Sequence, residues 1–283
     1  MIVEKIHLKE IFTDVLPDDT DPVVEMYLQT NMSEIGKENQ KRPAMIICPG
    51  GAYMQCSRLE AEPIALNFLS EGYNTFIINY SVVNHSFPTQ LIEIAALIEL
   101  IYSKQDEWNI DTDKLVIIGF SAGGHLASHY TNSFDCDEVR KVFPESKGVN
   151  ACVLCYPVIS AEERFIHKVS FERVSGKKEL TDEDINKFST DRLVSEKTPP
   201  TFLWHTTEDN SVPVGTSLIY ASALEKCKIP FELHIYPYGR HGLSTCDAQV
   251  LPQGESSMEC NIYNHRWLEE VKRWLQLIGF TSK

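Results

Sequence analysis

The amino-acid sequence predicts an α/β fold in which helices cover both faces of a mostly parallel, eight-stranded sheet. Three observations predict it. Short apolar, β-branched runs alternate with stretches of helical periodicity along most of the chain. Several of these runs are apolar on both sides, as strands between two layers of helices are. Finally, 43% of the 283 residues are hydrophobic, which is enough for one large core. We therefore expect a single domain, residues 1–283.

The strands are expected to be of two kinds. Ile2–His7 and Pro22–Gln29 alternate apolar and polar residues, which is typical of half-exposed antiparallel strands. From residue 44 onward the runs are apolar throughout, and buried parallel strands are predicted at Ala44–Cys48, Thr75–Asn79, Leu115–Gly119, Ala151–Tyr156 and Thr201–Trp204. Phe231–Tyr236 is predicted to be the eighth strand, and its apolar edge could pair with a second copy in a homodimer.

Helices are expected between these strands and after the last one. They are predicted at Pro63–Ser70, Pro88–Ile101, Ala122–Tyr130, Val214–Cys227 and Tyr263–Leu277. Strands that alternate with helices in this way are joined by right-handed crossovers and form one open sheet.

Residues 160–197 interrupt this alternation. The segment is polar and rich in charge and has no strand signal. Glu179–Phe188 could form a short helix capped by Thr181. We interpret the segment as a small lid inserted above the sheet; the alternative is an unstructured surface loop.

The charge balance excludes several classes of partner. The chain has 26 basic and 40 acidic residues, a net charge of −14. The negative electrostatic potential of such a chain repels phosphate backbones and anionic lipid surfaces. Neither a nucleic acid nor a membrane is therefore expected as a partner. The first ten residues lack an uninterrupted apolar segment, and no apolar stretch approaches the roughly 20 residues that a bilayer requires. We expect a cytoplasmic protein that acts on a small molecule.

No metal, redox or cofactor site is expected. The eight cysteines are predicted to be reduced, because this is the usual state in the cytoplasm. Cys152 and Cys155 have a C-x-x-C spacing, but side chains three apart on a strand point to opposite faces. His125 and His129 lie one turn apart on a helix that carries them away from Ser121, which favours a packing role over zinc binding.

A Gly-x-Ser-x-Gly sequence identifies the candidate nucleophile. Residues 119–123 read Gly-Phe-Ser-Ala-Gly, between a predicted strand and a predicted helix. Small residues two before and two after the serine allow a strained strand-to-helix turn. That turn would hold the Ser121 hydroxyl at a helix N-terminus, whose dipole favours developing negative charge. We expect Ser121 to be a nucleophile; the alternative is a glycine-rich turn without chemistry.

A serine hydroxyl needs a base that removes its proton, and His241 is the best candidate. It follows the last predicted strand, in a loop from which an imidazole can reach over the carboxyl ends of the strands. The base in turn needs a carboxylate that fixes its tautomer. Asp209 lies in the loop after Thr201–Trp204, before a Val-Pro that opens the next helix. It is preferred over its neighbour Glu208 and over Asp247.

The negative oxygen of a tetrahedral intermediate requires preorganised N–H donors. The backbone N–H of Ala122, directly after the serine, is one candidate. The second donor should come from the loop after Ala44–Cys48, where two glycines let the backbone approach a substrate. Gly51 and its neighbours Gly50 and Ala52 are the candidates there; an ordinary Pro-Gly turn is the alternative.

Together these motifs resemble the α/β-hydrolase superfamily, and within it the esterases related to acetyl-xylan esterases and to the hormone-sensitive-lipase and kynurenine-formamidase groups. The resemblance rests on Cys-Pro-Gly-Gly-Ala-Tyr (48–53), Glu-Gly-Tyr-Asn-Thr-Phe (71–76), Gly-Phe-Ser-Ala-Gly-Gly-His-Leu-Ala (119–127), Thr-Pro-Pro-Thr-Phe-Leu-Trp-His (198–205), Asp-Asn-Ser-Val-Pro (209–213) and Gly-Arg-His-Gly-Leu (239–243). Lipase-like groups have His-Gly-Gly where this chain has Pro49-Gly-Gly, a form similar to the carbohydrate-esterase branch. The resemblance thus implies an α/β-hydrolase fold and small acyl groups on sugars as substrates.

We expect a serine esterase that removes a short acyl group, such as acetyl, from a carbohydrate or a similar small alcohol, without a cofactor. Tyr53, Tyr80 and the lid are expected to shape the substrate pocket. A peptidase or amidase with the same three residues is the alternative, although the stretch before the first buried strand is too short for a domain that would gate peptides. A non-catalytic binding protein is a third possibility, disfavoured because all three residues are present.

Overall fold

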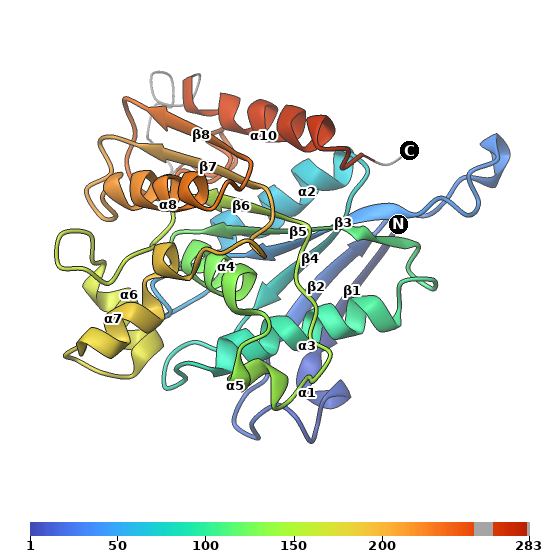
Figure 1. Cartoon of the computed structure of the whole chain (residues 1–283). Helices are drawn as coiled ribbons and strands as arrows, with labels where there is room; N and C mark the ends of the chain where they lie inside the picture. The colour runs from blue at the N-terminus through green and yellow to red at the C-terminus, as the bar shows by residue number, and fades with distance from the viewer. Residues whose placement is uncertain (252–262, 282–283) are drawn as a thin grey trace.

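The computed structural model describes residues 1–251 and 263–281. Within them, eight strands form one sheet in the order β1-β2-β4-β3-β5-β6-β7-β8 (Figure 1). The strands are β1 Ile2–His7, β2 Val23–Leu28, β3 Arg42–Cys48, β4 Asn74–Asn79, β5 Ile110–Phe120, β6 Ala151–Cys155, β7 Thr201–Thr206 and β8 Phe231–Tyr236. β3 to β8 are parallel, and β2 is antiparallel to both β1 and β4. The predicted mostly parallel, eight-stranded sheet is confirmed.

The helices connect the strands and pack on the sheet. They are α1 Leu8–Ile11, α2 Glu62–Ser70, α3 Thr89–Ser103, α4 Ala122–Ser133, α5 Asp137–Arg140, α6 Lys168–Ser175, α7 Asp182–Phe188, α8 Gly215–Lys226 and α10 Arg266–Leu277, with the 3₁₀ turns η1 Ser33–Ile35, η2 Arg58–Glu60 and η3 Thr190–Leu193. Every predicted helix is present within a few residues of its expected bounds. The sequence pattern missed α1, α5 and α6, because four to eight residues show too little periodicity to be recognised.

Two separate apolar cores lie on the two faces of the sheet. Successive residues of a strand point to opposite faces, so Ile46 and Ile47 of β3 belong to different cores. Ile46 packs in the core that includes Leu126 of α4. Ile47 packs in the core that includes Phe68 of α2 and Trp274 of α10. Figure 1 shows α2 and α10 on one side of the sheet and α3, α4 and α8 on the other, which confirms the expected cover on both faces.

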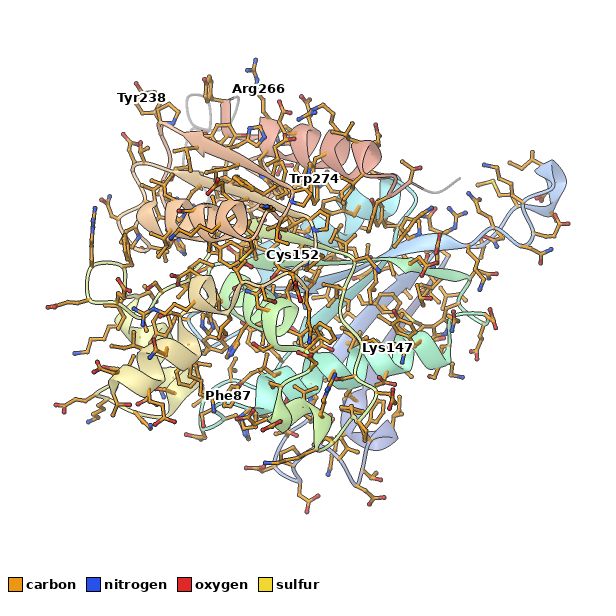
Figure 2. The ribbon with its side chains drawn as sticks, viewed as in Figure 1. Phe87, Lys147, Cys152, Tyr238, Arg266 and Trp274 are labelled. Carbon is orange, nitrogen blue, oxygen red and sulfur yellow. The ribbon has the colours of Figure 1, made fainter. Side chains whose placement is uncertain are left out.

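The cysteines of the described residues are buried or half-buried. Cys48, Cys56, Cys136, Cys152, Cys155 and Cys227 have free thiols. Cys152 of β6 lies in the interior, whereas Tyr238 and Arg266 project from the surface (Figure 2). Burial raises the pKa of the Cys152 thiol to about 12, so it remains a neutral thiol at ordinary pH. In the part of the chain that the structure describes, no helix has both the length and the apolar content needed to cross a bilayer.

Residues 160–197 form a small helical layer beside α4, not an unstructured loop. The layer contains α6, α7 and η3 and lies at one end of the molecule (yellow in Figure 1). Thr181 caps α7 as predicted: its side chain accepts the N–H of Asp184, whose carboxylate accepts the N–H of Thr181. The hydroxyl of Ser128 on α4 donates to the hydroxyl of Thr190. The layer is therefore docked on the core; its movement as a lid stays a prediction.

The parallel strands bring several loops to one edge of the sheet. β3, β5, β7 and β8 all point the same way, so the segments that follow their carboxyl ends meet at that edge. These segments carry the Gly50–Ala52 loop, Ser121, Asp209 and His241. The topology thus places together the residues that the sequence analysis selected.

Candidate active site

Ser121 lies in a strained turn between β5 and α4. Its φ of 53° and ψ of −118° are unfavourable for a residue with a side chain. The turn is tight because both flanking glycines touch backbone. A Cβ on Gly119 would lie 2.2 Å from the carbonyl oxygen of Gly123, and a Cβ on Gly123 would lie 2.1 Å from the carbonyl oxygen of Cys48. The peptide N–H of Ser121 donates to the Cys155 carbonyl at 3.0 Å, which anchors the turn to β6.

Three side chains from different loops form one hydrogen-bonded row. Ser121 Oγ lies 2.7 Å from His241 Nε2, and His241 Nδ1 lies 2.6 Å from Asp209 Oδ2. The carboxylate accepts from Nδ1, which leaves Nε2 as the acceptor of the serine hydroxyl proton. The structure therefore brings together the three residues that the sequence selected, in the geometry that a serine nucleophile and its base require.

Asp209 is held as a carboxylate by donors on both oxygens. Oδ1 accepts the backbone N–H groups of Ser211 and Val212 at 2.9 and 2.8 Å. Oδ2 accepts from His241 and from His205 Nε2, the latter at 3.2 Å. Burial alone would raise the pKa of Asp209, but the hydrogen bonds from the two histidines and the charge of His241 outweigh it and hold the pKa well below its usual range.

The other carboxylates that the sequence left open lie elsewhere. Glu208 Oε2 accepts the N–H of Gly239 at 3.1 Å. Asp247 Oδ1 accepts the hydroxyl of Thr245 at 2.9 Å. Among the described residues, Asp209 is the carboxylate that accepts a hydrogen bond from His241.

His205 is a second histidine in the row, and the sequence analysis did not anticipate its contact. Its ring is fully buried in β7. Nδ1 accepts from the Ser217 hydroxyl at 2.8 Å, and Nε2 donates to the Val212 carbonyl at 3.0 Å as well as to Asp209. Both partners of Nε2 are acceptors, so this ring nitrogen carries a proton. The only signal in the sequence was its position at the end of a predicted strand.

The expected N–H donors belong to the loop after β3 and to the residue that follows Ser121. Within the described residues, the N–H groups of Gly51, Ala52 and Ala122 have no hydrogen-bond acceptor in the protein. The N–H of Gly50 does have one, because it donates to Glu60 Oε2 at 2.8 Å. Gly50 is therefore less suited to bind an oxyanion than its neighbours, and Gly51, Ala52 and Ala122 remain the candidate donors.

An open cavity of about 540 Å³ contains the serine and the histidine. Most of its lining is polar or small: Gly51, Ala52, Met54, Gln55, Ser57, Leu59, Glu60, Ser121, His167, Ser211, Arg240, His241 and Gly242. His167 precedes α6, so the helical layer of residues 160–197 contributes to the cavity wall. The sequence analysis did not select Glu60, which ends a short turn without a recognisable motif, and it gave no role to Arg240, although Arg240 lies in the Gly-Arg-His-Gly-Leu motif.

Tyr53 and Tyr80 do not line this cavity, which corrects the expectation that they shape the substrate pocket. They are 1% and 2% exposed. The Tyr53 hydroxyl donates to His125 Nδ1 at 2.8 Å, and the Tyr80 hydroxyl donates to the Pro49 carbonyl at 2.7 Å. Both tyrosines thus support the loop of residues 49–53 from inside the core.

The histidine pair on α4 has a structural role. His125 Nε2 donates to the Phe188 carbonyl at 2.8 Å, and Nδ1 accepts from Tyr53, so both ring nitrogens are occupied. Burial lowers the pKa of His125 to about 4, which keeps the ring neutral. His129 is buried beside it, with its ring stacked on Phe87. This arrangement agrees with packing and not with zinc binding.

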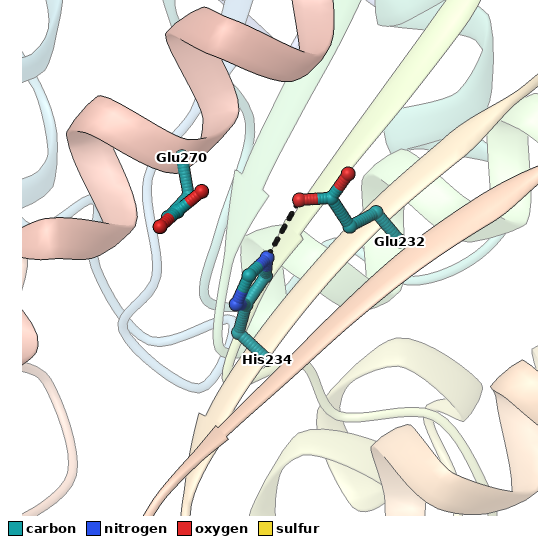
Figure 3. A group of neighbouring side chains, drawn as sticks. All are labelled: Glu232, His234 and Glu270. Atoms are coloured by element: carbon teal, nitrogen blue, oxygen red, sulfur yellow. Dashed lines mark hydrogen bonds and ion pairs between the residues drawn. The ribbon is translucent and has the colours of Figure 1, made fainter.

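One other cluster has ligand types that suit a metal ion. Glu232 and His234 of β8 and Glu270 of α10 place one ligand atom each within 4.8 Å of one another between the strand and the helix (Figure 3). His234 Nε2 donates to Glu232 at 2.8 Å. The guanidinium of Arg273 forms ion pairs with both glutamates, so a cation of the protein already contacts both carboxylates.

Comparisons with known proteins agree with this geometry. The family model BD-FAE matches residues 31–224. Endo-1,4-beta-xylanase B from Butyrivibrio fibrisolvens is 36% identical over 78% of this chain, and an acetylxylan esterase from Xylanibacter ruminicola is 32% identical over 75%. The chain spans 36% and 45% of the lengths of these relatives. The crystal structure of an acetyl ester-xyloside bifunctional hydrolase from Caldicellulosiruptor lactoaceticus has a TM-score of 0.83 and 36% identity, and covers 98% of this chain and 97% of that one.

Proposed function

The chain belongs to the BD-FAE family, and from that premise we propose that it is a serine esterase that removes short acyl groups, acetyl above all, from a carbohydrate or a similar small alcohol. The observation that carries the proposal is the row Ser121–His241–Asp209, with contacts of 2.7 and 2.6 Å. It opens on a cavity that contains unpartnered backbone N–H donors.

In the proposed reaction, Ser121 Oγ attacks the carbonyl carbon of the ester while His241 Nε2 takes the hydroxyl proton. Asp209 holds the imidazole in the required tautomer and stabilises the imidazolium. The N–H groups of Ala122 and Gly51, with Ala52 beside them, bind the negative oxygen of the tetrahedral intermediate. When the intermediate collapses, His241 returns the proton to the departing alcohol. A water molecule activated by His241 then releases the acid from Ser121.

The substrate class is supported by the relatives and by the cavity. An acetylxylan esterase and an acetyl ester-xyloside hydrolase, by their names, act on esters of a carbohydrate. Gln55, Ser57 and Ser211 line the cavity and offer groups that can hydrogen-bond sugar hydroxyls. The cavity is also open enough to admit an extended alcohol. These features favour an ester hydrolase over the peptidase or amidase alternative.

The test is Ser121→Ala, assayed on p-nitrophenyl acetate and on acetylated xylo-oligosaccharides. We expect kcat to fall by about 10⁴–10⁶ while the circular dichroism spectrum is unchanged. Ser70→Ala, which changes an exposed serine on α2, is the control and should keep full activity. Turnover by Ser121→Ala within tenfold of the unmodified chain would refute the assignment of the nucleophile. A higher kcat/KM on an aminoacyl anilide than on the acetyl esters would favour the amidase.

A further inference from the structure

Glu60 is a buried carboxylate at the edge of the candidate site. It ends η2, is 4% exposed and lines the cavity that contains Ser121 and His241. Burial raises the pKa of this carboxyl, and the hydrogen bonds from Tyr156 and Gly50, with the nearby His241, oppose the increase. Burying a carboxylate costs folding free energy unless hydrogen bonds compensate for the lost water. The donors that face Glu60 therefore show what the residue does in the fold.

One oxygen of Glu60 holds the loop of residues 49–53, which carries the proposed N–H donors and is called the oxyanion loop below. Oε2 accepts the N–H of Gly50 at 2.8 Å, and the Gly50 carbonyl accepts the N–H of Ser57 at 2.9 Å. Both backbone polar groups of Gly50 are therefore tied to the segment that carries Glu60. A Cβ on Gly50 would lie 2.9 Å from Ser121 Cβ, so only a glycine fits this close to the serine. The next two residues, Gly51 and Ala52, carry the unpartnered N–H groups, so the position of Gly50 sets where those donors point.

The other oxygen of Glu60 holds the loop of the histidine. Oε1 accepts the hydroxyl of Tyr156 at 2.7 Å, and that hydroxyl accepts the N–H of Ser244 at 2.9 Å. Ser244 lies three residues after His241. The ring of Tyr156 packs edge-on against the imidazole of His241, with 5.1 Å between the centroids. Glu60 thus reaches the proposed base through Tyr156 in two ways, by a hydrogen bond to its loop and by a ring contact.

We propose that Glu60 is a positioning residue for the reaction, one that joins the oxyanion loop to the loop of His241 through Gly50 on one oxygen and Tyr156 on the other. The inference rests on the proposed function. The two loops come from distant parts of the sequence, and the N–H donors must be aligned with the developing oxyanion while His241 is aligned with Ser121. A carboxylate with two acceptor oxygens satisfies both requirements at once. No proton or electron passes through Glu60.

The inference makes a specific kinetic prediction. Oxyanion donors act most strongly when charge develops on the substrate oxygen, so misaligned donors lower kcat with little effect on KM. Glu60→Gln keeps the shape and one acceptor oxygen but presents an N–H donor to either Gly50 or Tyr156. We expect kcat on p-nitrophenyl acetate to fall by about 10- to 100-fold with KM within threefold, and Glu60→Ala to fall further.

Two further variants keep the test decisive. Tyr156→Phe retains the ring against His241 and removes only the link from Glu60 to the loop of His241, so it should lower kcat even if Glu60→Ala does not fold. Glu62→Gln changes an exposed glutamate two residues away and should keep full activity. Rates are expressed per site labelled by a fluorophosphonate, so that a loss of folded protein does not count as a loss of kcat.

The outcomes separate the inference from the proposed function. If Ser121→Ala is inactive while Glu60→Gln and Tyr156→Phe keep the kcat of the unmodified chain per labelled site, the positioning role is wrong and the esterase proposal stands. A rise in KM with unchanged kcat would also overturn the inference, because it would assign Glu60 to substrate binding. If Ser121→Ala remains active, the proposed function itself fails.

Discussion

Replacing Asp209 by asparagine tests the proposed row Ser121–His241–Asp209, because it exchanges one carboxylate oxygen for an NH₂ group. The carboxylate of Asp209 accepts on both oxygens: two backbone N–H groups at Oδ1, and two imidazole nitrogens at Oδ2. Asparagine has the same shape but only one oxygen, so its NH₂ group must face one of these pairs of donors. The backbone donors of Ser211 and Val212 cannot change their protonation, whereas an imidazole can change its tautomer. The NH₂ group should therefore turn toward His241.

That orientation makes Nδ1 of His241 an acceptor and moves the ring proton to Nε2. In this tautomer Nε2 can no longer accept the proton of Ser121, and the base is lost although the residue is present. A wrong tautomer of this kind lowers kcat by about 10⁴ in serine hydrolase triads. This corresponds to about 5 kcal/mol of transition-state stabilisation. We expect Asp209→Asn to show a loss of that size on p-nitrophenyl acetate, with KM nearly unchanged.

Glu208→Gln is the matched control for this substitution. Glu208 is the neighbouring carboxylate, but its side chain accepts the N–H of Gly239 and makes no hydrogen bond to His241 within the described residues. Its kcat should stay within about threefold of the unmodified chain. Both variants are measured at the same pH, with thermal unfolding as a check that they fold. Less than a tenfold loss in Asp209→Asn, or a larger loss in Glu208→Gln, would show that the proposed role of Asp209 is wrong.

Two further predictions concern stability. Gly123→Ala should lower the free energy of unfolding in urea by about 3 kcal/mol or prevent folding, because the new methyl would lie 2.1 Å from the Cys48 carbonyl oxygen; a change below about 1 kcal/mol would contradict the close contact. Burial raises the pKa of Glu93 to about 7, so its contribution to stability is complete below its unfolded pKa and is lost as the pH rises through 7, by about 3 kcal/mol. Urea unfolding at pH 5 and pH 8 should show this loss reduced in Glu93→Gln; equal pH dependence in the two proteins would contradict it.

The sheet and the turn at Ser121 were predictable because their determinants are local or repetitive. A strand that is buried on both faces can be recognised from its own run of apolar residues. The glycines at 119 and 123 mark a place where no side chain fits between strand and helix. The meeting of Ser121 with His241 followed from topology alone, since parallel strands bring their carboxyl ends to one edge. Bounds were less accurate where strands continue into polar residues: β5 begins at Ile110, although its predicted apolar run begins at Leu115.

The direction of a loop side chain was not predictable, and the tyrosines show why. Ala52 and Tyr53 both adopt a φ of 56°, a conformation that non-glycine residues rarely take. The Tyr53 side chain points inward to His125, whereas Ala52 lines the cavity. An aromatic residue beside a proposed oxyanion loop is as compatible with a pocket floor as with a core support. Only the backbone angles decide between them, and no sequence pattern encodes those angles here.

The length of the side chain distinguishes Asp209 from Glu208, although both residues are acidic. Both residues are carboxylates in the same loop, and either could in principle accept from His241. An aspartate, however, is short enough to accept N–H groups two and three residues further on, as Asp209 does from Ser211 and Val212. This local bonding occupies Oδ1 and leaves Oδ2 for the histidines. A glutamate has one more methylene to order and does not favour that turn. The proposed acid is therefore the carboxylate that its own loop holds in place. His241, 32 residues further along the chain, donates to the other oxygen.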